Sequence, residues 1–197
     1  MGRPSLLRSV GAALTVACAL WVLSCDGGDP DPRHSIVLVT IDTTRPEYLS
    51  CYGHPRPTTP NLDALAQSGV LVETAWAQAP ETGPSLASTL TSRVAPVTGV
   101  RANAERLREG LPTLATVASD AGYDTAAFVS TALLGARWTA LDRGFDVYDD
   151  EMTDPCFGHD DAQRIAERTI DAALAWVATP RERPFLLWVH LYDPHGP

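Results

Sequence analysis

The chain of 197 residues contains no lysine, so arginine supplies all 15 of its basic side chains, against 24 acidic ones. Its formal net charge is −9 at pH 7, and loss of residues 1–25, which hold two arginines and no acid, would bring it to 13 − 24 = −11. This balance argues against nonspecific binding to nucleic acid, which needs a basic surface. An anionic ligand would have to be held locally, by a metal ion or by clustered arginines.

Long apolar runs are scarce, and the first one lies near the N-terminus. Residues 10–23 are apolar apart from Thr15 and follow two arginines. The run is short for a transmembrane helix and has the length of a signal-peptide core. It ends in Leu23-Ser24-Cys25, which resembles a bacterial lipobox, whose cysteine is lipidated and becomes the new N-terminus. We therefore interpret residues 1–25 as a lipoprotein signal peptide with Cys25 as the lipidation site. An uncleaved anchor and an ordinary secretory signal are the alternatives.

Residues 26–34 consist of glycine, proline, charged residues and a histidine, so we expect a flexible tether between lipid and domain. The protein would then be attached to a membrane by lipid, in the bacterial cell envelope, on its periplasmic or extracellular face. Cysteine is also scarce: outside the signal segment only Cys51 and Cys156 occur. In an oxidising compartment these two could form a disulfide, a pairing that the sequence leaves open.

Residues 35–197 alternate predicted strands and helices. Residues 35–41 and 185–191 are continuous apolar runs, typical of strands buried on both faces of a parallel sheet. Further strands are predicted at 70–76 and 123–129. Helices are predicted from Pro60 to Gly69, at 84–91, at 111–121 and at 160–178. This order indicates an α/β sandwich with a mainly parallel sheet.

Ligands bind at the carboxyl ends of the strands in such sheets. Asp42 follows the first predicted strand, Thr82 lies just before the helix at 84–91, and His195 follows the last strand. We expect these three places to converge in space. His190 lies within the last strand, where we expect it to pack or to form a hydrogen bond.

Three segments resemble the sulfatase family of the alkaline-phosphatase superfamily. They are IVLVTIDTTRPEYLSCYG at 36–53 with its continuation TTPNLDALAQSGVLVETAWAQAP, ETGPSLASTLT at 81–91, and WVHLYDPHGP at 188–197. The resemblance implies an alkaline-phosphatase-like fold and metal-dependent cleavage of small anionic sulfate or phosphate esters. It also implies that residues 35–197 are the N-terminal part of such a domain, truncated at its C-terminus.

The resemblance assigns roles to four residues. Asp42 matches a metal-binding carboxylate, which suits a hard divalent cation; a helix cap or turn is the alternative. Thr82 matches the nucleophile, which also binds the metal; the alternative is a simple helix cap. His195 matches a histidine that contacts the substrate or the leaving group. Arg45 either contacts the substrate anion or lies unengaged at the surface.

Threonine at position 82 bears on the reaction. Sulfatases carry a cysteine or serine there, converted to formylglycine within C/S-x-P-x-R, whereas residues 82–86 read TGPSL. A metal-activated threonine is a competent nucleophile, and water can resolve a phosphothreonine. A sulfothreonine lacks the aldehyde-hydrate route of release, so threonine favours phosphorus esters. Backbone N–H groups after Thr82 are expected to offer an anion site. Calcium would suit a sulfatase-like site, and zinc or manganese a phosphodiesterase-like one.

Other features depart from the family pattern. Thr43 follows Asp42 where many members have a second aspartate, and Phe128-Val129-Ser130 stands where sulfatases carry Lys-x-His. In the family, an Asp-His or Asp-Asn pair beyond the last matching segment completes the metal site, since one aspartate and one threonine are too few ligands. We also expect the last strand to lack its neighbours, and the acid-rich residues 142–151 to form a solvated loop. Two alternatives to a hydrolase stay open: a noncatalytic sulfatase-like lipoprotein and a phospho-headgroup transferase.

Overall fold

The computed structural model describes residues 33–152 and 163–195. From His34 onward they belong to one compact unit. The predicted signal peptide, the lipidation site Cys25 and most of the tether lie outside the described residues, as does Cys156. The signal, the lipid anchor and the disulfide therefore stay predictions. No helix in the described ranges is both long and apolar enough to span a bilayer.

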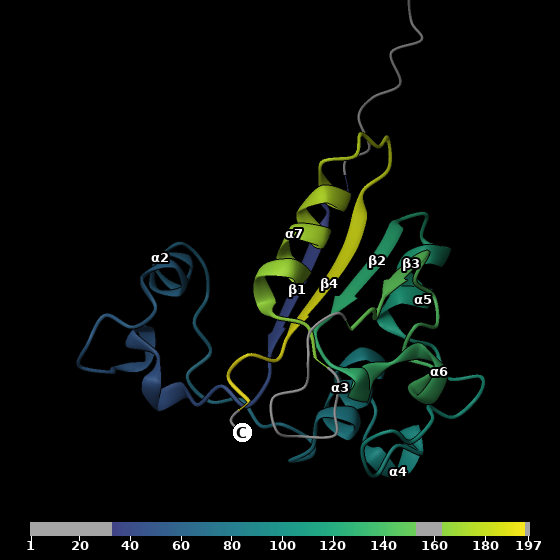
Figure 1. Cartoon of the computed structure of the whole chain (residues 1–197), viewed down its shortest axis with the longest axis horizontal. Coiled ribbons are helices and arrows are strands. Elements are labelled where there is room, and N and C mark those ends of the chain that lie inside the picture. The colour runs from purple at the N-terminus through teal and green to yellow at the C-terminus, as the bar shows by residue number, and fades with distance from the viewer. Residues whose placement is uncertain (1–32, 153–162, 196–197) are drawn as a thin grey trace, which may run out of the picture. The chain divides into compact units, whose positions relative to one another are not determined.

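A four-stranded parallel sheet organises this unit (Figure 1). Its strands are β1 (Ile36–Ile41), β2 (Asp124–Val129), β3 (Val147–Asp149) and β4 (Phe185–Leu191), in the spatial order β1-β4-β2-β3. Every neighbouring pair is parallel, which confirms the predicted α/β class. The last strand, β4, pairs with both β1 and β2, so the expectation that it would lack neighbours was wrong.

The two apolar strands differ in burial. Residues 186–190 of β4 are buried, as predicted for a strand covered on both faces. In β1, by contrast, Val37 is 57% and Val39 is 52% exposed, so the same prediction was wrong there. The reason is position: β4 is central, whereas β1 lies at the edge of the described sheet, where nothing lies beside it among the described strands.

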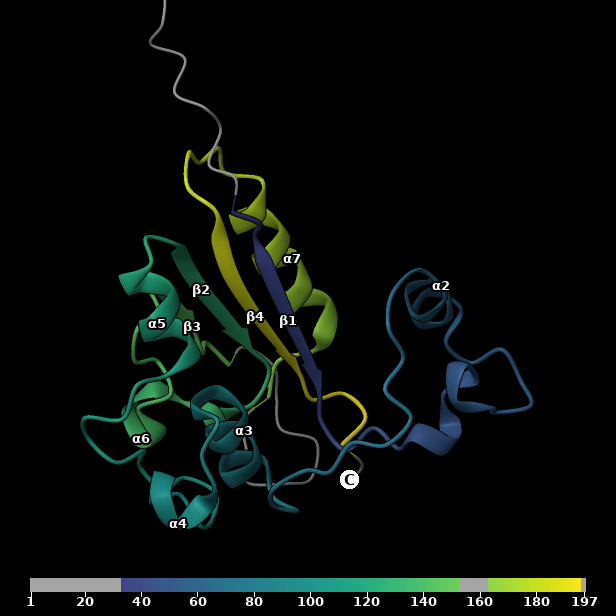
Figure 2. The same cartoon turned by 180° about the vertical axis from the view of Figure 1, so that it is seen from behind.

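Helices cover the two faces of β4 and β2. On one face, α7 (Ala166–Val177) contributes Ala173, which packs against Phe128, Leu187 and Val189. On the other face, α3 (Thr82–Thr91) and α5 (Leu114–Asp120) pack over Trp188 and Leu186 respectively. The view from behind shows α5 and α3 on the face opposite α7 (Figure 2). The main core thus fixes α3 against the middle of β4.

The remaining elements are short. They are the 3-10 helices η1 (Pro46–Tyr48), η2 (Ser50–Tyr52) and η3 (Ala132–Leu134), and the α-helices α2 (Pro60–Ser68), α4 (Ala95–Thr98) and α6 (Ala136–Thr139). Helix α2 begins at Pro60 and ends before Gly69, as predicted. Residues 70–76, predicted as a strand, form none, and Val70 and Trp76 are exposed. The acid-rich segment 142–151 is not simply a loop, because it contains β3.

Candidate active site at the ends of β1 and β4

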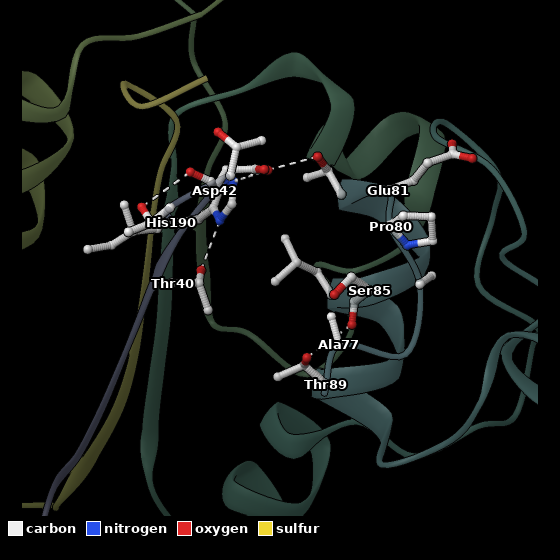
Figure 3. A pocket seen from close by; sticks show the side chains of 14 residues that line it. Thr40, Asp42, Ala77, Pro80, Glu81, Ser85, Thr89 and His190 are labelled. Atoms are coloured by element: carbon white, nitrogen blue, oxygen red, sulfur yellow. Dashed lines mark hydrogen bonds and ion pairs between the residues drawn. The ribbon is translucent and has the colours of Figure 1, made fainter. Parts of the chain in front are cut away.

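A cavity of about 420 Å³ lies where the carboxyl ends of β1 and β4 face the first turns of α3 (Figure 3). Thr40, Asp42 and His190 line its strand side, and Thr82 and Ser85 its helix side. This is the place in a parallel α/β sheet where ligands bind. The structure therefore brings together Asp42 and Thr82, which are 40 residues apart in the sequence.

A hydrogen bond connects these two residues directly. The Thr82 hydroxyl donates to Oδ2 of Asp42 at 2.7 Å. Asp42 is the first residue after β1, and its backbone N–H still donates to the carbonyl of Leu191, so the carboxylate stands on a rigid strand end. Thr82 is the first residue of α3, after the cap position Glu81. Its side chain therefore points to Asp42 and does not cap the helix, unlike the alternative considered from the sequence.

The Asp42 carboxyl is a stabilised anion. Its side chain is only 11% exposed, and this burial raises its pKa. The nearby His190 and the hydrogen bond from Thr82, with a smaller effect of His195, outweigh burial and hold the pKa of Asp42 below its usual value. Asp42 is thus ionised at neutral pH, as a metal ligand or an acceptor for the threonine hydroxyl must be.

The backbone is strained next to this carboxylate. Thr43 has a φ of 49°, in the left-handed region that β-branched residues rarely adopt. It also lines the cavity. Such strain tends to persist where the surrounding structure imposes it, often at functional sites.

His190 is the main addition to the residues expected from the sequence. It is 1% exposed, its Nδ1 lies 2.9 Å from the Thr40 hydroxyl, and its Nε2 lies 3.6 Å from Oδ2 of Asp42. The predicted hydrogen bond is confirmed, but the prediction missed that the ring faces the site. The sequence feature that could have indicated a position at the site is a polar side chain near the carboxyl end of an apolar strand.

Asn103 is a second addition, and it changes the expected anion site. Its Oδ1 accepts from the backbone N–H of Gly83 at 2.8 Å. The N–H of Ser85 donates to the carbonyl of Glu81 at 3.0 Å, and Pro84 has no N–H to offer. The N–H groups that follow Thr82 in the first turn are therefore already used, so the expectation of a ready anion site there was wrong. Nothing in the sequence pointed to Asn103.

His195 lies near the site but outside the cavity wall. The ring of His195 stacks on the ring of Tyr192, with centroids 4.4 Å apart. The backbone N–H of His195 donates to the backbone carbonyl of Tyr192 at 3.0 Å. Asp193 fixes the same loop by accepting a hydrogen bond from the N–H of Ala166. The charge on His195 is close enough to contribute to the lowered pKa of Asp42.

Arg45 is directed elsewhere. Its guanidinium is exposed, forms an ion pair of 2.6 Å with Glu47 and lies 5.2 Å from the ring centre of Tyr48. It lines a separate cavity of about 470 Å³, together with Thr43 and Pro194. The structure thus does not bring Arg45 into the cavity of Asp42 and Thr82, and its role in substrate binding stays a prediction.

The donors present fit a divalent cation in kind but not in number. Asp42 and Thr82 offer the oxygen ligands that hard cations prefer, and they already lie together at the cavity wall. Within the described ranges, however, no group of three or more His, Cys, Asp or Glu side chains is placed to hold a metal ion. The described residues can therefore supply only part of a metal site.

A parallel α/β sandwich that carries a carboxylate and a helix-start hydroxyl at its strand ends fits the alkaline-phosphatase-like superfamily of enzymes. Within that class, residues 34–197 match the sulfatase family, and the chain belongs to it. Two similar proteins of Bacteroides thetaiotaomicron are a Delta 4,5-hexuronate-2-O-sulfatase and an N-acetylglucosamine-6-O-sulfatase, each 26% identical. The matches cover 83% and 97% of this chain but 35% and 36% of those proteins. The chain thus spans about a third of the length of these curated relatives.

Solved structures show the same fold. The C-terminal periplasmic domain of EcEptC from Escherichia coli, in complex with zinc, superposes with a TM-score of 0.64 at 24% identity, covering 86% of this chain and 45% of that one. The phosphonate monoester hydrolase of Agrobacterium radiobacter gives a TM-score of 0.63 at 22% identity, covering 83% and 42%. At these identities the likeness establishes the fold alone.

Replacing Thr43 with asparagine tests the strain beside Asp42. Asparagine tolerates a positive φ better than threonine, so we expect Thr43→Asn to raise the free energy of unfolding by about 1 kcal/mol in urea titrations. Thr44→Asn is the matched control, because Thr44 is not among the residues with positive φ. An equal effect of both substitutions would show that the conformation of Thr43 carries no strain.

Proposed function

We propose that the protein is a metal-dependent hydrolase of small anionic sulfate or phosphate esters, with Thr82 as its nucleophile. The observation that carries this proposal is the 2.7 Å hydrogen bond from Thr82 to Asp42 inside the cavity. A threonine that served only as the first residue of a helix would not require a hydrogen bond to an ionised carboxylate. Family membership supports the reaction class, because the relatives are named as sulfatases.

The reaction follows from this pairing. The hydrogen bond to Asp42 orients the Thr82 hydroxyl, and the oxygen, after losing its proton to solvent, forms a bond to the phosphorus or sulfur atom. The bond to the ester oxygen breaks, and His195 donates a proton to that leaving oxygen. Water then attacks the Thr82 adduct, releases sulfate, phosphate or, from a diester, a phosphate monoester, and restores the hydroxyl, while His195 regains its proton from solvent. His195 fits the role of acid because its loop lies beside the strand end that carries Asp42.

Asp42 and Thr82 would hold the metal ion, with further ligands from outside the described residues. A bound divalent cation lowers the pKa of a coordinated hydroxyl and neutralises charge that develops on the ester. Calcium would fit a sulfatase-like ligand set, and zinc or manganese a phosphodiesterase-like one. Arg45 would contact the substrate only after release from Glu47, because it is now directed away from this cavity.

Phosphorus esters are the favoured substrates. The arginine of the C/S-x-P-x-R pattern is replaced by Leu86, which is buried in the core against residues of α3 and β4. Leu86 also lines the cavity, but it carries no charge, so this position supplies no cationic group to a bound anion. Together with threonine in place of a formylglycine precursor, this argues against the aldehyde-hydrate chemistry of sulfatases.

Removal of the nucleophile should abolish turnover. We expect Thr82→Ala to lower kcat/KM for a nitrophenyl phosphate diester or a nitrophenyl sulfate by at least about 10³-fold, and Thr82→Ser to retain part of the activity because the hydroxyl remains. Thr89→Ala is the matched control on the same helix and cavity wall, without a contact to Asp42. Unchanged turnover in Thr82→Ala would exclude the nucleophile role.

Removal of metal should abolish turnover as well. We expect chelation to eliminate activity. Back-titration with calcium, zinc or manganese should then identify the ion that restores it. Calorimetry of Asp42→Asn should show that ion binding at least about tenfold more weakly than the unsubstituted protein. Full activity in a protein shown by elemental analysis to be free of metal would contradict the proposal.

We also propose that lipid on Cys25 attaches the protein to a membrane of the cell envelope. The support is the apolar run at 10–23 that ends at this cysteine. In bacterial cells, labelled palmitate should be incorporated into the protein but not into Cys25→Ser, with Cys51→Ser as the control. Equal labelling of all three proteins would exclude Cys25 as the lipidation site.

A further inference from the structure

Four side chains form a chain of contacts that ends at the candidate site. The indole Nε1 of Trp188 donates to the Thr40 hydroxyl at 3.0 Å, and that hydroxyl lies 2.9 Å from Nδ1 of His190. On the far side of the ring, Nε2 lies 3.6 Å from Oδ2 of Asp42 and has no hydrogen-bond partner. Figure 3 shows the ring between Thr40 and Asp42.

We propose that His190 is a positioning residue, held by Thr40 and Trp188 as the neutral tautomer with its proton on Nε2, and that this N–H fixes the Asp42 carboxylate. The tautomer and its contact follow from the geometry alone. Only the consequence for turnover rests on the function proposed above.

The donors and acceptors determine the tautomer. An indole N–H can only donate, so Thr40 accepts from Trp188 and keeps its own single proton. The contacts of the Thr40 hydroxyl in the structure are to Trp188 and to Nδ1 of His190, so this proton is best placed on the bond to Nδ1. Nδ1 is then the acceptor, and the ring proton lies on Nε2, which faces the carboxylate.

In the opposite tautomer, with the ring proton on Nδ1, the Thr40 hydroxyl proton and the Nε2 lone pair of His190 would both lack a suitable hydrogen-bond partner. If Nδ1 donated to Thr40, the Thr40 proton would lose its acceptor, and the lone pair of Nε2 would face an anionic oxygen. His190 is buried and Thr40 is half-buried, and unmatched polar atoms are costly away from water. That arrangement would become favourable only if His190 itself bound a cation through Nε2, because a metal-binding histidine donates its other N–H to a fixed acceptor.

The proposed tautomer has a consequence for Asp42. Both Thr82 and His190 approach the same oxygen, Oδ2. Among the described residues, Oδ1 takes part in no hydrogen bond or ion pair. The hydrogen bond from Thr82 and the Nε2–H of His190 that faces Oδ2 at 3.6 Å would together hold the carboxylate in one orientation and leave Oδ1 for a ligand. His190 would thus keep the carboxylate oriented while the Thr82 hydroxyl gives up its proton.

Nitrogen-15 NMR of the purified protein tests the tautomer directly. Long-range proton–nitrogen spectra should give His190 an unprotonated Nδ1 and a protonated Nε2, with the signals assigned by their loss in His190→Gln. Thr40→Val removes the hydroxyl and should abolish the preference for this tautomer. Thr40→Ser keeps the hydroxyl and should preserve it, which separates the hydrogen bond from general damage to the fold. A proton on Nδ1, or a tautomer unaffected by Thr40→Val in a folded protein, would overturn the proposal.

Kinetics of His190 variants test its consequence. We expect His190→Leu to lower kcat by about 10- to 100-fold with a smaller change in KM, and His190→Gln to recover much of the loss, because its amide can still donate toward Asp42. Equal losses in both folded variants would overturn the positioning role. An unsubstituted protein that turns over no ester would refute the proposed function and leave the tautomer result standing as an independent test of the inference.

Discussion

The hydrogen bond between Thr82 and Asp42 is the contact on which the rest of the site depends. It exists only if the end of β1 and the first turn of α3 are held together, although 40 residues separate them. Parallel pairing of β1 with β4 over six residue pairs, from Ile36 with Leu186 to Ile41 with Leu191, holds the strand end. Packing of α3 over Trp188 holds the helix. The core that stabilises the fold is thus also the support of the site, and Trp188 belongs to both through its indole N–H.

Few cationic side chains are available near the site, and this limits the chemistry that the site can perform. The chain has no lysine, and Phe128-Val129-Ser130, which stands where sulfatases carry Lys-x-His, is buried at the carboxyl end of β2. Arg45 is paired with Glu47, and Leu86 replaces a family arginine. In the proposed function, negative charge on an ester would therefore have to be neutralised mainly by a bound cation. This agrees with the proposed function, in which the ionised Asp42 carboxylate and the Thr82 hydroxyl would together bind a metal ion.

The sequence allowed much of the fold to be predicted, since β4, β2, α2 and α3 follow from apolar runs, a helix-starting proline and a helix-ending glycine. It failed where tertiary position decides. Residues 70–76 alternate in polarity but pair with none of the described strands, β1 is apolar but lies at an edge, and β3 is too short and acidic to be recognised. At the site, family resemblance predicted roles for Asp42 and Thr82, and the structure brings these two residues together. The position of His190 at the site and the contact of Asn103 with Gly83 were not predicted, because both depend on neighbours that are distant in the sequence.

Trapping a covalent intermediate tests most directly whether Thr82 is the nucleophile. The protein is mixed with a nitrophenyl phosphate diester, quenched in acid during turnover, and digested for tandem mass spectrometry. We expect a phosphoryl-derived adduct on the hydroxyl of Thr82 in the peptide that contains this residue. The adduct should be absent when the ester is omitted. An adduct on another residue, or turnover with no adduct on Thr82 at any quench time, would contradict the nucleophile role.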